Sequence, residues 1–131
     1  MIWIDNPPIN AGALGVRQGV LDAIAQLSDD ASLQAAVLMG AGSTFVAGSD
    51  LREFGQPLQE PQLPVVIAAI ENCGKPVVAA LHGAALGGGL DLALGCDARV
   101  AAPGTRLGLP EITLGMIPGT DGFVAGRHGR D

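Results

Sequence analysis

Three consecutive glycines, Gly87, Gly88 and Gly89, constrain the fold of this chain more than any other feature of its sequence. They follow residues 77–81, whose continuous apolar character predicts a buried strand, and they precede an expected helix over residues 89–94. The first backbone N–H groups of a helix have no partner within it, so a glycine-rich helix start can face an anion. A tight turn that needs positive φ would explain the same glycines. The pattern therefore predicts a strand–turn–helix unit and leaves open whether it binds a ligand.

Strand-like and helix-like segments alternate along the rest of the chain. The expected strands are residues 2–4, 36–39, 77–81, 98–101 and 106–109, and the expected helices are residues 14–27, 65–73 and 89–94. Such alternation favours an α/β layered architecture with much parallel pairing. We expect residues 1–121 to form one core domain and residues 122–131, which have little periodicity, to form an irregular tail.

The composition argues against several classes of protein. The net charge is −6 and the seven basic residues are spread along the chain, so a nucleic-acid-binding surface is not expected. The uncharged apolar run at residues 76–90 is too short to span a membrane and is interrupted by His82 and glycines. Cys73 and Cys96 lack the spacing of a zinc site, and two free thiols predict a cytoplasmic location.

Two acidic residues, Asp91 and Glu111, are candidates for proton transfer. Asp91 falls in the first turn of the expected helix, where an acid also interacts favourably with the helix dipole without any catalytic role. Glu111 lies among apolar residues, so it either turns to solvent or occupies a pocket. The pattern alone leaves both alternatives open for each acid.

A second candidate donor site is the run Gly48-Ser49-Asp50. An ordinary turn explains it, but the backbone N–H of Ser49 could also face that of Gly88 across a ligand carbonyl. An oxyanion hole needs two such donors, and loops after two different strands can supply them. The Walker, dinucleotide-binding and serine-hydrolase glycine motifs are all absent, and His82 is expected to be a packed or turn histidine.

Four ordered segments together resemble the crotonase superfamily, the enoyl-CoA hydratase/isomerase family. They are NPPINA at residues 6–11, FVAGSD at 45–50, GGGLDLALGCD at 87–97 and GLPEITLGMIPG at 108–119. The resemblance is closest to the N-terminal part of peroxisomal-type bifunctional enzymes. It implies a crotonase-like ββα spiral core that is truncated at the C-terminus, because the family's domain runs to roughly twice this length.

The resemblance also implies an acyl-CoA thioester substrate, with coenzyme A as part of the substrate and no separate cofactor or metal. By motif, the oxyanion donors are the backbone N–H groups of Ser49 and Gly88, and the site acids are Asp91 and Glu111. Substrate contacts are expected from the neighbouring residues, which are Ala47, Gly48, Asp50, Leu51 and Gly87. Family members form trimers or hexamers, so a homo-oligomer is expected, with no nucleic acid and no membrane as partners.

The expected activity is that of a lyase, an enoyl-CoA hydratase of fatty-acid β-oxidation that adds water syn to 2-enoyl-CoA. Asp91 replaces the usual hydratase glutamate and Ser49 replaces the commoner alanine. A carboxylate one methylene shorter can misplace the water by about 1 Å, which can cost about 100-fold in rate. One alternative is a double-bond isomerase that uses Glu111 alone, and the other is an inactive acyl-CoA-binding fragment that needs a partner chain.

Overall fold

The computed structural model describes residues 1–7, 9–48, 57, 59–109, 112–116 and 123–126. A five-stranded sheet has the order β1-β2-β3-β5-β8, with β1 at Ile2–Ile4, β2 at Ala36–Gly40, β3 at Val77–Leu81, β5 at Ala98–Ala101 and β8 at Phe123–Gly126. Its first four strands are parallel, with Leu38 opposite both Ile2 and Ala79. These observations confirm the α/β class and the parallel pairing that the sequence predicts.

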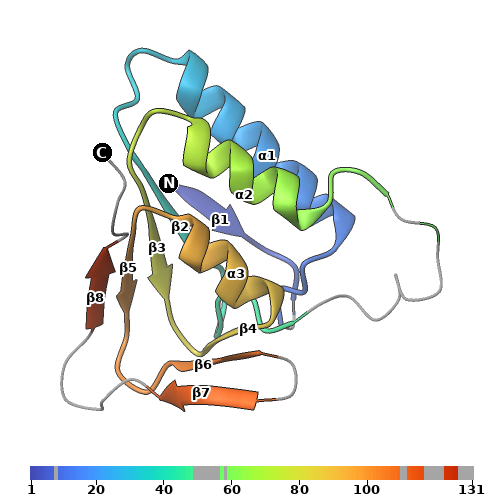
Figure 1. Cartoon of the computed structure of the whole chain (residues 1–131), viewed down its shortest axis with the longest axis vertical. Coiled ribbons are helices and arrows are strands. Elements are labelled where there is room, and N and C mark those ends of the chain that lie inside the picture. Colours follow the sequence, from blue (N-terminus) through green and yellow to red (C-terminus); the bar gives the residue numbers. More distant parts are fainter. Residues whose placement is uncertain (8, 49–56, 58, 110–111, 117–122, 127–131) are drawn as a thin grey trace.

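Three helices accompany the sheet and contact one another in the order α1, α2, α3 (Figure 1). They are α1 at Leu14–Asp29, α2 at Leu63–Asn72 and α3 at Gly88–Gly95. Each overlaps the helix predicted from the sequence. None of the described helices is both long and apolar enough to cross a membrane.

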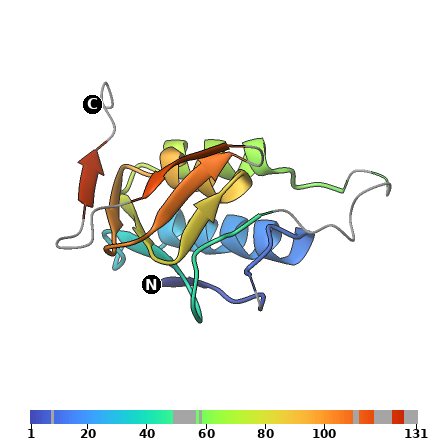
Figure 2. The same cartoon turned by 90° about the horizontal axis from the view of Figure 1, so that it is seen from below.

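A second, three-stranded sheet has the order β4-β6-β7 and lies beside α3 (Figure 2). Its strands are β4 at Ala84–Leu86, β6 at Arg106–Leu109 and β7 at Ile112–Met116. β4 and β7 were not predicted, because β4 is only three residues long and β7 is interrupted by a glycine. β6 pairs in parallel with β4 and antiparallel with β7, so it lies between the strand that leads into the glycine turn and β7.

The prediction of an irregular tail over residues 122–131 is wrong for residues 123–126. This segment forms β8, which pairs antiparallel with β5 so that Phe123 lies opposite Ala101. An edge strand offers unpaired N–H and C=O groups, and the Phe-Val pair has the propensity to occupy such an edge. The division into a core of residues 1–121 and a tail remains a prediction.

The core is mostly aliphatic, with one buried aromatic side chain among the described residues, Phe45, and it is built from one stripe of each helix and the facing side of the sheet. Its most deeply buried large side chains include Leu38, Phe45, Val66, Ile70 and Val77. Each such side chain contributes about 1.5–3 kcal/mol when it is removed from water. The packed core therefore fixes α3, and with it the glycine turn, against the parallel sheet.

Candidate functional site

The glycine turn joins β4 directly to α3. Gly87 has φ 56° and ψ −120°, a conformation that a residue with a Cβ rarely adopts. Its N–H donates to the Gly108 carbonyl at 2.8 Å, and its carbonyl accepts from the Asp91 N–H at 3.1 Å. The turn is thus bonded to β6 on one side and to the first turn of α3 on the other.

The start of α3 presents a backbone donor. Within the described part of the chain, the Gly88 N–H donates to no carbonyl. Gly89 packs on the backbone of Val46, and a Cβ at Gly89 would overlap the Val46 carbonyl. A Cβ at Gly88 would lie 3.1 Å from Leu63 Cδ2, so the start of α2 covers this side of the turn. The close approach to Val46 therefore requires glycine at position 89, and the N–H of Gly88 is left available to a ligand.

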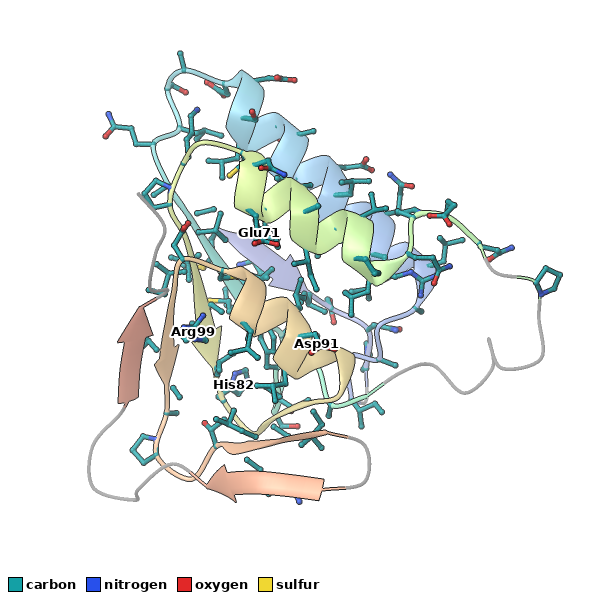
Figure 3. The ribbon with its side chains drawn as sticks, viewed as in Figure 1. Glu71, His82, Asp91 and Arg99 are labelled. Carbon is teal, nitrogen blue, oxygen red and sulfur yellow. The ribbon has the colours of Figure 1, made fainter. Side chains whose placement is uncertain are left out.

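The segment that precedes Ser49 lies beside this helix start. The Val46 carbonyl accepts from the Leu86 N–H at 3.0 Å, which places residues 45–48 next to β4. Phe45 is fully buried and donates its N–H to the His82 carbonyl at 2.9 Å. His82 itself lies in the turn after β3 and contacts the Gly42 carbonyl through Nε2, as expected for a turn histidine (Figure 3).

Ala47 and Gly48 are held from the opposite side by the NPPINA segment. The Ala47 N–H donates to the Ile9 carbonyl at 3.0 Å, and the Gly12 N–H donates to the Gly48 carbonyl at the same distance. Two of the four motifs are therefore adjacent in space. Gly48 has φ 143°, which favours glycine at this position.

Asn10 organises the NPPINA segment from within. It is 1% exposed, has φ 53°, and donates through Nδ2 to the carbonyls of Ala41 and Thr44, both at 2.9 Å. Its Oδ1 accepts from the Asn6 N–H at 2.8 Å. The second asparagine of the motif therefore holds this turn against the loop after β2.

Asp91 lies one turn into α3, and its side chain is exposed (Figure 3). The predicted residues Ser49, Asp50, Leu51 and Glu111 lie outside the described residues. Glu111 is three residues beyond Gly108, so covalent geometry keeps their Cα atoms within about 10 Å of each other. Because Gly108 is bonded to Gly87, the described structure brings the chain that leads to Glu111 close to the turn before Asp91.

Sequence reasoning missed Arg17, which is 8% exposed. It donates to the carbonyls of Gly12, Pro61 and Gln59 at 2.8, 2.7 and 3.4 Å. A signal was present in the helical spacing. Arg17 falls on the stripe shared by Val20, Ile24 and Leu27, which is the buried face of α1.

Known proteins resemble this chain over most of its length. The chain matches the family model described as enoyl-CoA hydratase/isomerase over residues 1–127. A peroxisomal bifunctional enzyme of Danio rerio is 44% identical over 122 residues, which cover 93% of this chain and 17% of that protein. A probable enoyl-CoA hydratase of Bacillus subtilis is 39% identical over 129 residues, which cover 93% of this chain and 50% of that protein.

Solved structures show the same fold. A crystal structure of an enoyl-CoA hydratase from Bacillus anthracis superposes with a TM-score of 0.72 at 34% identity, covering 89% of this chain and 49% of that one. The predicted crotonase-like fold is thereby confirmed. This chain spans half or less of the length of these relatives. Its sequence and its fold both place it in one family, and the chain belongs to the enoyl-CoA hydratase/isomerase family.

Proposed function

We propose that this chain carries the acyl-CoA site of an enoyl-CoA hydratase of fatty-acid β-oxidation. The observation that supports this most directly is the Gly88 N–H. It stands at the start of α3 without a partner among the described residues, between the segment that leads to Ser49 and the strand that leads to Glu111. The relatives include proteins described as enoyl-CoA hydratases and peroxisomal bifunctional enzymes.

In the proposed reaction, the N–H groups of Gly88 and Ser49 bind the thioester oxygen of the substrate. The choice of Ser49 as the second donor rests on its place in the FVAGSD motif, directly after Gly48. Negative charge develops on the thioester oxygen as water adds to Cβ, and each fixed donor is worth about 100- to 1000-fold in rate.

The proposed acid–base groups are Glu111 and Asp91, which share one water molecule. One carboxylate removes a proton from the water while the water oxygen bonds to Cβ, and the electron pair of the double bond moves towards the thioester oxygen. The protonated carboxyl group then gives a proton to Cα as the enolate collapses, so that H and OH add across the double bond. Positioned proton transfer of this kind contributes about 100- to 10,000-fold.

One observation favours an isomerase as the second candidate. Asp91 is shorter than the glutamate of the family motif, and its carboxylate is exposed. A shift of one proton between two carbons needs only one acid–base group, so Glu111 alone would suffice. In that case Asp91 contributes little to turnover.

Comparing two substrates tests these proposals. We expect the purified protein to consume crotonyl-CoA, with loss of the absorbance of its conjugated enoyl group and formation of 3-hydroxybutyryl-CoA. Conversion of 3-enoyl-CoA to 2-enoyl-CoA without hydration would instead identify an isomerase. Binding of acyl-CoA by calorimetry without turnover would identify the binding fragment, and no binding would reject all three proposals.

Self-association and a cytoplasmic location are further proposals. Val65 and Leu94 are 48% and 51% exposed on α2 and α3, two helices that contact each other, so these side chains are candidates for a contact between copies of the chain. Light scattering of the purified protein across a dilution series measures the oligomeric state. A monomer at all concentrations would contradict the expected trimer or hexamer.

A further inference from the structure

Arg17 connects three backbone segments that are distant in sequence. It lies in the first turns of α1, where its guanidinium is almost fully buried. Nη1 donates to the Gly12 carbonyl at 2.8 Å, whereas Nε donates to the Pro61 carbonyl at 2.7 Å. A planar guanidinium with donors on several edges is suited to holding separate carbonyls at a fixed distance.

The first of these bonds leads to one proposed oxyanion donor. The same Gly12 residue that accepts from Arg17 donates its N–H to the Gly48 carbonyl at 3.0 Å. Gly48 immediately precedes Ser49. A single residue, Gly12, therefore links the guanidinium to the segment that leads to the Ser49 donor.

The second bond leads to the other donor. Pro61 lies two residues before Leu63, the first residue of α2, and the Arg17 contacts to Gln59 and Pro61 hold the approach to this helix. Leu63 packs on the turn at Gly88, where a Cβ would lie 3.1 Å from Leu63 Cδ2. The other side of the guanidinium thus contacts the segment that covers the Gly88 donor.

We propose that Arg17 is a positioning residue that sets the geometry of the two oxyanion donors by bridging Gly12 and Pro61. This inference rests on the proposed acyl-CoA function. Arg17 acts through Gly48 on one side and through Leu63 on the other, and it does not touch the substrate. Its loss leaves the buried Pro61 carbonyl and the partly buried Gly12 carbonyl without this donor and lets the two segments move apart.

The test uses Arg17→Met and Arg17→Lys, with Lys75→Met as a matched control. Lys75 also donates to backbone carbonyls, those of Leu27 and Asp30 at 2.6 and 2.7 Å, but at the opposite end of α1. Lys75→Met therefore removes a cation that binds carbonyls at the other end of the same helix, without touching the proposed site. Arg17→Lys keeps the charge but replaces the planar fork by a single ammonium group, and it serves if Arg17→Met does not fold.

Two readouts separate positioning from stability alone. The first is crotonyl-CoA hydration with kcat and KM measured separately. Misplacement of donors by about 1 Å predicts a loss of about 100-fold in kcat for Arg17→Met, with a smaller change in KM. The second is the absorption band of a bound, conjugated aryl enoyl-CoA, which moves to longer wavelength when donors polarise its carbonyl.

We expect a smaller band shift in Arg17→Met, an intermediate shift in Arg17→Lys, and in Lys75→Met the wild-type shift with only a lower melting temperature. Arg17 variants that fold and match Lys75→Met in both kcat and band shift would overturn the inference while leaving the proposed function intact. A wild-type protein without turnover or band shift would overturn the proposed function itself, and the role of Arg17 with it.

Discussion

The Gly87 amide donates a 2.8 Å hydrogen bond to the Gly108 carbonyl and so joins the start of α3 to β6. This bond brings together two motifs that are about twenty residues apart in sequence. Asp91 follows Gly87 by one helical turn, and Glu111 follows Gly108 by three residues. The proposed acid pair therefore depends on the pairing of β4 with β6 more than on either motif alone.

Gly89→Ala should destabilise the fold. The added Cβ would overlap the Val46 carbonyl, and backbone atoms cannot move aside as a flexible side chain can. Overpacking of this kind typically costs about 1–3 kcal/mol. Denaturant unfolding measures the change in the free energy of unfolding.

Gly15→Ala is the matched control, since a Cβ placed at this glycine of α1 has no described atom within 4 Å apart from those of its own stretch of helix. It should be neutral or stabilise the protein by up to about 1 kcal/mol, because alanine favours helix more than glycine. Equal effects of the two substitutions would contradict the close approach of Gly89 to Val46.

Asp91→Asn should lower hydration of crotonyl-CoA by about 100-fold or more, because the amide cannot accept the proton of water. Asp91→Glu restores the length of the family motif and should retain or raise the rate. Glu71→Gln changes another exposed acid, on α2, and should leave kcat and KM unchanged (Figure 3). An unaltered hydration rate in Asp91→Asn would contradict a role of Asp91 in hydration.

Asn10→Ala should destabilise the fold by about 3 kcal/mol, because it leaves the carbonyls of Ala41 and Thr44 without their donor at a buried site. It also places alanine at φ 53°, which asparagine tolerates better. Asn10→Gly removes the same hydrogen bonds, but glycine adopts a φ of 53° without strain. Unfolding measurements should therefore find Asn10→Gly less destabilised than Asn10→Ala, and the reverse order would contradict this account.

The environment of Asp30 predicts that the stability of the folded protein depends on pH. Hydrogen bonds from the Ser32 side chain and backbone, with a smaller contribution from Lys75, lower the pKa of Asp30 below its ordinary value of 3.8. Because the pKa is lower in the folded protein, the ionised carboxylate stabilises the fold at pH values above the unfolded-state pKa. This contribution is lost as the pH falls through the folded-state pKa.

Asp30→Asn should therefore be less stable than the wild type at neutral pH. The difference should shrink between pH 3.8 and the lower folded-state pKa. Thermal unfolding of both proteins at several pH values measures the difference. A difference that stays constant down to the lowest pH would contradict the role of the Asp30 carboxylate.

Much of this fold could be predicted from local pattern. The apolar runs of β2, β3 and β5 and the spacing of α1 and α2 depend on residues within each element, and these elements were predicted with small errors at their ends. β4 and β8 could not be found this way. Each is short, and each is stabilised by a strand that is remote in sequence, β6 for one and β5 for the other.

In the candidate site too, some residues could be predicted from local pattern and others could not. The glycines at 87–89 indicate a turn and a helix start from sequence alone, because their backbone freedom is a local property. Arg17 was missed because its bonds to Gly12 and Pro61 depend on tertiary packing, although its place on the apolar stripe of α1 was a usable signal. Glu111 and Ser49 remain predictions from motif.

The hydration rate of crotonyl-CoA by Glu111→Gln, compared with the wild type, tests the central claim most directly. The glutamine keeps the size of the side chain and removes its ability to exchange a proton, so acyl-CoA affinity serves as the control for folding. We predict that binding persists and that turnover falls by about 100- to 10,000-fold. Turnover at the wild-type rate in Glu111→Gln would contradict the proposed mechanism.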